Sequence, residues 1–267
     1  MASSVTAHTN MDPAPRVDIL IDDADLSVET HSITVWQISS AGQFEVRNAV
    51  RRAAAGGFFV TDYEVPLGVP VTYRVQEFNS GGTELSFALN LPVQVNVSHG
   101  FAFISDPLVP SRAVRVSAEA GFAAQLRQTR PAKVYRAGNN TIALLGQRGL
   151  LEDVPLRVWT DDPDVRDTLD LIVAETQFLV RTGPEFPIPR LLHVVVQSPE
   201  RLPMDYAHGG TTDVWDLTGS QVSRTELEII VPVVSYARFS AAFATYADFN
   251  AAYSTYLDAI SNPPPEA

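Results

Sequence analysis

The 267-residue sequence contains no cysteine, which excludes disulfide bonds, thiolate metal sites and cysteine nucleophiles. Lysine is nearly absent too, because Lys133 is the only one and the other basic residues are arginines. Acidic residues outnumber basic residues and give a formal net charge of −12. This charge argues against nucleic acid as a partner, since binding to a duplex depends on neutralising its phosphates.

Long apolar runs are missing as well. No stretch reaches the roughly 18 apolar residues that a membrane-spanning helix needs, so we expect no membrane insertion. The first residues, Met1 to Thr6, show neither a basic leader nor an apolar segment, and we expect no export signal. With 45% hydrophobic residues and a mean hydropathy near zero, the composition predicts a soluble globular protein with sizeable cores.

The N-terminal third is rich in short segments of β-branched and aromatic residues separated by glycine and proline. This spacing is typical of an antiparallel β-sandwich. The predicted strands are 17–21, 32–38, 58–60, 71–76 and 86–89. We therefore predict an extended N-terminal arm over residues 1–15, followed by an all-β domain over 16–98.

The rest of the chain predicts a second β-rich domain. Residues 99–112 are bracketed by Gly100, Pro107 and Pro110, and we interpret them as a linker. A β-sandwich with one helix should then occupy 113–234. The helix is expected to begin at Thr160-Asp161-Asp162-Pro163, which offers a capping residue, acids for the first turn and a proline suited to helical φ. Strands are predicted at 178–181, 191–196 and 227–231.

The C-terminus, residues 235–267, repeats an aromatic pattern every ten residues and ends in a proline-rich tail. Two of the three repeat units place an acid three residues after a threonine, which is a helix-start signal. An aromatic residue with a ten-residue period does not stay on one face of a continuous helix, so we predict a run of short helices. Such a run should not bury its rings against itself. The expected contact residues, on another subunit or on the parent domain, are Tyr236, Phe239, Phe243, Tyr246, Phe249, Tyr253 and Tyr256.

Two resemblances add to this interpretation. Residues 62–75, followed by Asn79-Ser80-Gly81-Gly82, resemble the late strands of fibronectin type III-like domains. From 141 to 231, the sequence has a Leu156–Thr160 strand, an acid-capped helix, a Phe178–Thr182 strand, a Leu-Leu-His-Val-Val strand and an Asp213–Leu217 segment. That order resembles the galectin-like second domain of minor tail proteins from long-tailed bacteriophages infecting actinobacteria, and the repeated end is similar to their C-termini.

Together, the two resemblances imply a mainly β protein: a fibronectin III/Ig-like sandwich, a galectin-like sandwich with one helix, and a short-helix repeat. It implies a structural minor tail protein without catalytic activity, made in the host cytoplasm and built into the virion at the distal tail or baseplate. Its partners would be other tail proteins and copies of itself. Distal tail proteins proper open with a ring-forming domain. Residues 16–97 look fibronectin-like instead, which places hexameric ring formation in question.

Two other function classes remain open. A carbohydrate-binding module for host-surface sugar would need an exposed ring, and Trp215 is the candidate because Trp36 and Trp159 fall in strand patterns that favour core positions. A glycan hydrolase would need carboxylates and histidines that converge in a deep pocket, which spacing alone does not reveal.

The sequence offers no motif for a metal or cofactor site, and we predict neither. The acids Asp22, Asp23 and Asp25 lack the central glycine and distant glutamate of a calcium loop. The histidines show no zinc-binding spacing, and His208-Gly209-Gly210 occurs without a nucleophile elbow, so it favours a flexible turn.

Overall fold

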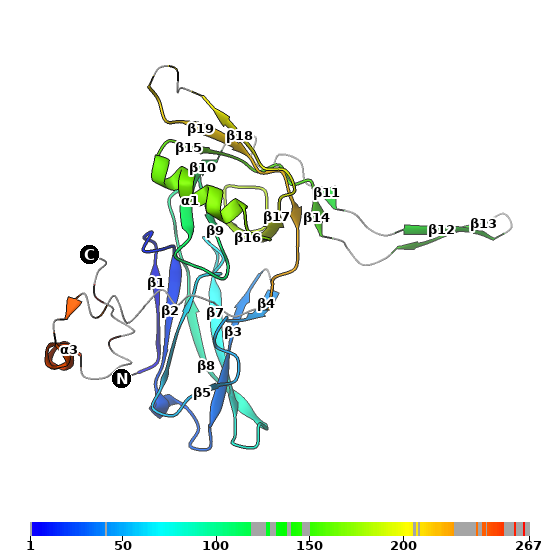
Figure 1. The fold of residues 1–267 in the computed structure, drawn as a ribbon. Coiled ribbons are helices and arrows are strands. Elements are labelled where there is room, and N and C mark those ends of the chain that lie inside the picture. Colours follow the sequence, from blue (N-terminus) through cyan, green and yellow to red (C-terminus); the bar gives the residue numbers. More distant parts are fainter. Residues whose placement is uncertain are drawn as a thin grey trace. The chain divides into compact units, whose positions relative to one another are not determined.

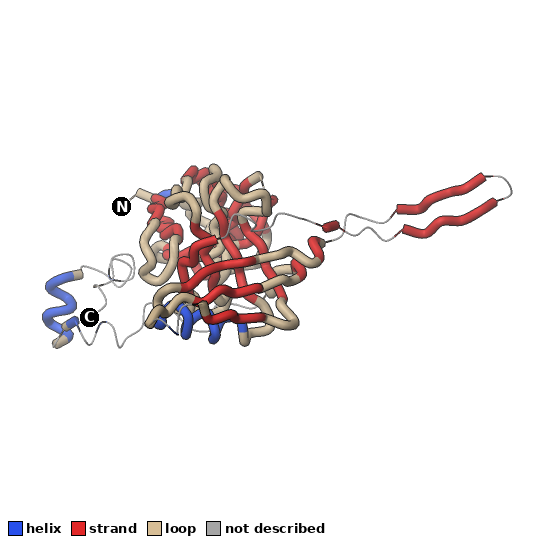
Figure 2. The backbone as a smooth tube through the Cα atoms, turned by 90° about the horizontal axis from the view of Figure 1, so that it is seen from above, coloured by secondary structure: helices blue, strands red, loops and turns tan. Residues whose placement is uncertain are grey.

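The computed structural model describes residues 2–40, 42–118, 127–128, 132–137, 140–145, 150–204, 207, 209–226, 239, 242–243, 245–253, 259 and 264. The fold is mainly β, with several antiparallel sheets, as the sequence predicts. Figure 2 shows strands, in red, prevailing over helices, in blue. Two compact units are present: unit 1 contains residues 1–98, 105–113 and 226–267, and unit 2 contains residues 99–104 and 114–225.

Unit 1 contains two sheets, with strand orders β1-β2-β6 and β4-β3-β7-β8, and the short β5 pairs with β3 (Figure 1). Its elements are β1 (Ser4–His8), β2 (Arg16–Ile21), η1 (Asp23–Asp25), β3 (Ser32–Ser39), β4 (Gly42–Glu45), β5 (Arg52–Ala53), β6 (Phe58–Asp62), β7 (Val71–Phe78), β8 (Glu84–Val93) and α3 (Tyr246–Ala252). Strands β2 and β7 alternate between buried and half-buried residues, which is the pattern of strands with one face in a core.

A buried carboxylate connects the two sheets of unit 1. Asp62, at the end of β6, accepts hydrogen bonds from Gln37 Nε2 at 2.5 Å and from the Tyr73 hydroxyl at 2.6 Å, on β3 and β7. Its other oxygen accepts the backbone N–H of Glu64 at 2.8 Å. Burial raises the pKa of Asp62, and its hydrogen bonds act in the opposite direction. The two sheets therefore share a buried polar contact.

Unit 2 is built on an eight-stranded sheet with the order β18-β19-β15-β10-β9-β16-β17-β20. Its strands are β9 (Phe101–Ser105), β10 (Ala113–Ala118), β15 (Arg157–Thr160), β16 (Phe178–Thr182), β17 (Leu191–Val195), β18 (Glu200–Pro203), β19 (Asp213–Asp216) and β20 (Ser220–Gln221). Two further ladders lie between β10 and β15 in sequence: β11 (Arg127–Gln128) with β14 (Leu151–Glu152), and β12 (Ala132–Ala137) with β13 (Asn140–Leu145).

Helix α1 (Pro163–Val173) covers one face of this sheet. It begins as predicted, because the Asp162 side chain accepts the backbone N–H of Asp164 at 2.9 Å and Pro163 occupies the first turn. Leu169 and Ile172 are buried in a core that also contains residues of β9, β10, β15, β16, β17 and β19. The helix thus closes the apolar side of the sheet.

The structure changes three of the predicted boundaries. The expected arm over 1–15 contains β1, which pairs with β2 from Ser4↔Leu20 to His8↔Arg16. The expected linker over 99–112 contains β9, a strand in which all but the first residue are buried. Because β9 lies inside the eight-stranded sheet, unit 2 begins at residue 99 and not at 113. The predicted strand over 227–231 lies outside the described residues.

Candidate interaction surfaces

The C-terminal aromatic repeat forms a short capped helix, as predicted for its second unit. The Thr245 side chain accepts the backbone N–H of Asp248 at 3.2 Å, and the Asp248 carboxylate accepts the backbone N–H of Thr245 at 3.0 Å. Helix α3 ends at Ala252, because Tyr253 adopts an extended backbone. The third unit, at 255–258, lies outside the described residues.

Five aromatic rings of this segment pack on one another. Phe249 is the centre, with its ring centroid 5.4–5.9 Å from four other rings. The contacts to Phe239 and Phe243 are edge-to-face, a favoured geometry for aromatic pairs. We call this set the aromatic cluster: Phe239, Phe243, Tyr246, Phe249 and Tyr253.

The expectation that the repeat cannot bury its rings against itself is therefore wrong for the described residues. Phe249 is only 9% exposed, although the other residues of α3 are exposed. Tyr246 is the outermost ring of the cluster, with 56% of its surface exposed. Tyr236 and Tyr256 lie outside the described residues. Among the described residues proposed for contact, Tyr246 offers the most surface to another chain.

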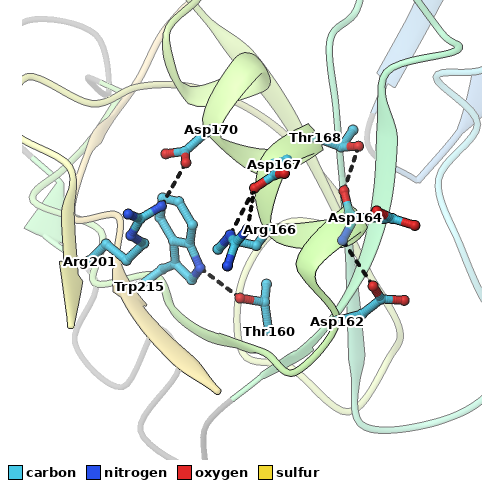
Figure 3. A network of polar contacts seen from close by, with 9 residues as sticks. All are labelled: Thr160, Asp162, Asp164, Arg166, Asp167, Thr168, Asp170, Arg201 and Trp215. Carbon is cyan, nitrogen blue, oxygen red and sulfur yellow. Dashed lines mark hydrogen bonds and ion pairs between the residues drawn. The ribbon is translucent and has the colours of Figure 1, made fainter. Parts of the chain in front are cut away.

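Trp215, the predicted sugar platform, lies in the core of unit 2 with 2% of its surface exposed. Figure 3 shows its indole Nε1 donating to Thr160 Oγ1, at 2.9 Å. Arg201 lies over the ring, with its Cζ 5.5 Å from the centroid, and pairs with Asp170 of α1 at 2.7 Å. A buried ring under an arginine has no free face for a sugar, so this placement does not support the stacking hypothesis at Trp215.

Trp159 lies on the opposite face of the same sheet. Residues directly opposite each other in antiparallel strands share a face. The register therefore places Trp159 in a row with Ser117 of β10, Val214 of β19 and Leu202 of β18, away from α1. Trp159 is half-buried and Leu202 is exposed, contrary to the expected core position of Trp159. The sequence pattern missed this residue because a strand does not reveal which of its faces is covered.

Charged residues flank this row. Arg157, Asp216 and Glu200 are opposite one another on β15, β19 and β18, and they share the face of Trp159. All three are exposed. On the neighbouring strands, Arg115 lies over the ring of Phe101, with its Cζ 4.7 Å from the centroid. We call residues 117, 157, 159, 200, 202, 214 and 216 the outer row. It combines one aromatic ring with donors and acceptors.

Trp36 is also half-buried, in unit 1, and its indole Nε1 donates to Gln76 Oε1 at 2.8 Å. On the same face, the guanidinium of Arg74 lies over Phe87 of β8, with its Cζ 4.4 Å from the ring centroid. The exposed residues of this face thus satisfy one another. Trp36 is less suited than Trp159 to receive a ligand.

The acids near residue 22 have structural partners. The Asp22 side chain caps η1 by accepting the Ala24 N–H at 3.0 Å, and Asp25 accepts the Ser3 N–H at 2.7 Å. The hydrogen bond from Ser3 lowers the pKa of Asp25. No group of three or more acids and histidines that could hold a metal ion occurs within the described residues.

In the described part of the chain, an acid lies close to a histidine at two separate places. His8 Nε2 lies 2.8 Å from Asp18, and His99 Nδ1 lies 3.4 Å from Glu185, where the histidine side chain is 83% exposed. Burial would raise the pKa of Glu185, but hydrogen bonds from the backbone and from His99 outweigh it and lower the pKa. These pairs give no geometric basis for the hydrolase hypothesis. His193 is buried in β17, and His208 lies outside the described residues.

No family model, curated protein or solved structure matches the chain. In the described part of the sequence, no helix has both the length and the apolar character required to cross a membrane.

Proposed function

We propose that this chain is a structural tail protein of a bacteriophage, which works by contact with other protein chains at the distal tail or baseplate. The observation that carries the proposal is the order β15, α1, β16, β17 and β19, the elements on which the resemblance to minor tail proteins rests. The aromatic cluster supports it further, because its outermost ring, Tyr246, is available to a partner.

The cluster also suggests how such a contact is made. A helix of seven residues is not stable alone in water, so the ring contacts and the capping box hold α3 in shape. A pre-ordered segment loses less conformational entropy on binding than a flexible one. The proposed role of the C-terminus is therefore a preformed contact element of the tail.

The test is to locate the protein in purified tails of the phage that encodes it, by mass spectrometry and by labelling with an antibody. We expect it in the particle at the end distal to the capsid. A variant that ends at residue 234 should fold but be depleted from tails, whereas the single substitution Leu171→Ser, at an exposed position of α1, should be incorporated normally. Absence of the full-length chain from purified tails contradicts the proposal.

The outer row favours a second candidate function, binding of a host-surface saccharide. Trp159 offers a partly exposed ring, and the adjacent Arg157, Asp216 and Glu200 offer the polar groups that hydroxyls require. Titration with a panel of mono- and disaccharides, followed by tryptophan fluorescence, tests this function. Trp159→Ala should raise the dissociation constant about tenfold or more, a loss of about 1.4 kcal/mol, while Trp36→Ala should not. Equal binding by both variants contradicts it.

A further inference from the structure

Between β10 and β15 in sequence, the described strands β11 to β14 form two ladders that are not part of the eight-stranded sheet. Strands β10 and β15 pair directly with each other, at Ser117↔Trp159 and Ala118↔Val158. Beyond this pairing, β11 pairs with β14, and β12 pairs with β13 from Ala132↔Leu145 to Ala137↔Asn140 (Figure 1). We call the ladder of β12 and β13 the hairpin arm. In the described chain, no third strand pairs with β12 or β13.

A ladder of two strands is marginally stable in water on its own. Consecutive residues of a strand lie on opposite faces, so the pairs Val134↔Ala143 and Tyr135↔Ile142 place apolar residues on both faces of the ladder. One sheet face can be solvated when it is polar, but neither face here is polar throughout. This composition predicts a partner that covers at least one face of the hairpin arm.

The charge of the segment indicates the nature of that partner. Residues 121–150 contain five basic residues and no acid: Arg127, Arg130, Lys133, Arg136 and Arg148. The whole chain has a formal net charge of −12, so the remainder is more acidic than the whole. The only lysine of the protein, Lys133, is in this segment. Complementary charge of this kind steers association and sets its orientation.

We propose that the hairpin arm docks on a second copy of this chain, whose residues outside 121–150 carry a net negative charge. This inference rests on the proposed function, to which it adds a surface and a partner. The arm and the surface that receives it are different patches, so the contact is heterologous and builds a ring or an open array. Nucleic acid would also attract a basic hairpin, but the acidic remainder of the chain repels it.

The test is self-association of the purified full chain, measured by sedimentation velocity between 50 and 500 mM NaCl. We expect oligomers at low salt, with a dissociation constant that rises about tenfold or more across this range, because salt screens the attraction. The variant Lys133→Glu/Arg136→Glu should remain monomeric. The control Arg115→Glu/Arg166→Glu, which changes the net charge equally outside the hairpin arm, should associate as the parent does.

A second variant keeps the result interpretable if charge reversal affects folding. Replacing residues 129–149 by a four-residue Gly/Asn/Ser turn retains β11 and β14 but removes β12 and β13. We expect an unchanged melting temperature, within about 2 °C, and a monomer at every salt concentration. Self-association of this variant equal to the parent's overturns the inference, and so does a parent that stays monomeric up to about 100 μM.

Two other outcomes distinguish this inference from nucleic-acid binding by the hairpin arm and from the proposed function. In the first, the parent does not self-associate but binds a duplex oligonucleotide in a salt-sensitive way, and Lys133→Glu/Arg136→Glu abolishes this binding. That outcome would assign the arm to nucleic acid and overturn the inference. Arm-dependent self-association of a protein that is absent from purified tails would support the inference and contradict the proposed function.

Discussion

The aromatic cluster and the hairpin arm are both rich in apolar residues, but they differ in the contacts that each makes with the rest of the described chain. In the cluster, Phe249 lies at the centre of four other rings, and the capped helix α3 positions them. In the arm, β12 and β13 pair only with each other among the described strands. The cluster covers its central apolar residue internally, whereas the arm has only a single ladder.

This difference changes which segment indicates an interface. A repeat of aromatic residues is conspicuous in the sequence, but its rings at Phe239 and Phe243 contact Phe249 of the capped helix α3. Two paired strands alone are marginally stable in water, so a ladder of this kind is expected to need another surface. We infer that a segment without internal cover indicates a partner more directly than a segment with many aromatic residues.

The strongest way to break this comparison is to remove the centre of the cluster. Phe249→Ala deletes the ring that contacts four others and should destabilise the segment by about 3–5 kcal/mol, because neighbouring rings do not refill the space. The helix α3 should then be lost. Ring-current shifts of the tyrosines and near-ultraviolet circular dichroism report this change.

The matched control is Tyr246→Ala, at the exposed edge of the cluster. It should reduce stability by less than half as much, while it impairs incorporation into tails. If both substitutions have equal effects on the ring-current shifts, Phe249 is not the centre that its position indicates.

A second prediction concerns Glu77, a buried residue whose carboxylate is surrounded by hydrogen-bond donors of its own chain. Glu77 of β7 is buried and accepts hydrogen bonds from Ser27 N at 2.7 Å, and from the hydroxyls of Ser27, Thr30 and Ser86 at 2.7–3.1 Å. Glu77→Gln should cost about 1.5–3 kcal/mol at neutral pH, since bonds to a charged group are the stronger ones. Thermal melting of both proteins at pH 7 measures the difference.

The pH dependence gives a second measure at the same residue. Burial would raise the pKa of Glu77, but the hydrogen bonds outweigh it and hold the pKa below its usual value. A carboxylate with a lowered folded pKa contributes stability above its unfolded pKa, roughly 4.3, and this contribution is lost as the pH falls through the folded pKa. The parent should therefore lose more stability than Glu77→Gln below pH 4. Parallel pH profiles would show that Glu77 does not carry this contribution.

Local signals explain which parts of this structure were predictable from the sequence. The alternation in β2 and β7 and the caps at Asp162 and Thr245 involve residues close in sequence, and each predicted its element. Strand β9 was missed because a run buried on both faces does not alternate, and its flanking glycine and prolines suggested a linker.

Which aromatic residues are buried and which are exposed depends on tertiary structure, and local sequence patterns do not give it. Whether Trp159 or Trp215 faces the helix follows from the register of β15 with β19 and from the position of α1, which are tertiary. The contact of Phe239 with Phe249 likewise depends on the direction in which the chain turns between them. The basic character of residues 121–150, in contrast, is a property of composition alone.

A smaller effect is expected at the cap of α3. Thr245→Ala removes both hydrogen bonds of the Thr245 hydroxyl, but keeps the bond from the backbone N–H of residue 245 to Asp248, and should destabilise the segment by about 1 kcal/mol. Thr245→Ser keeps the hydroxyl and should behave as the parent does. Amide hydrogen exchange across α3 measures both, and equal protection in the parent and Thr245→Ala would show that the ring contacts alone hold the helix.

The smallest effect on stability is expected for a substitution in the hairpin arm. This substitution gives the clearest test of the difference between the arm and the aromatic cluster. Tyr135→Ser/Ile142→Ser replaces a directly opposed apolar pair of β12 and β13. Because no other described strand pairs with this ladder, the free energy of unfolding of unit 2 should change by less than about 0.5 kcal/mol. Self-association should nevertheless weaken, since the partner loses apolar contact area. Leu202→Ser, at an exposed apolar position of β18, is the control and should leave both quantities unchanged. A large loss of stability in the Tyr135/Ile142 variant would mean that the ladder packs within its own chain, and the arm would then resemble the aromatic cluster after all.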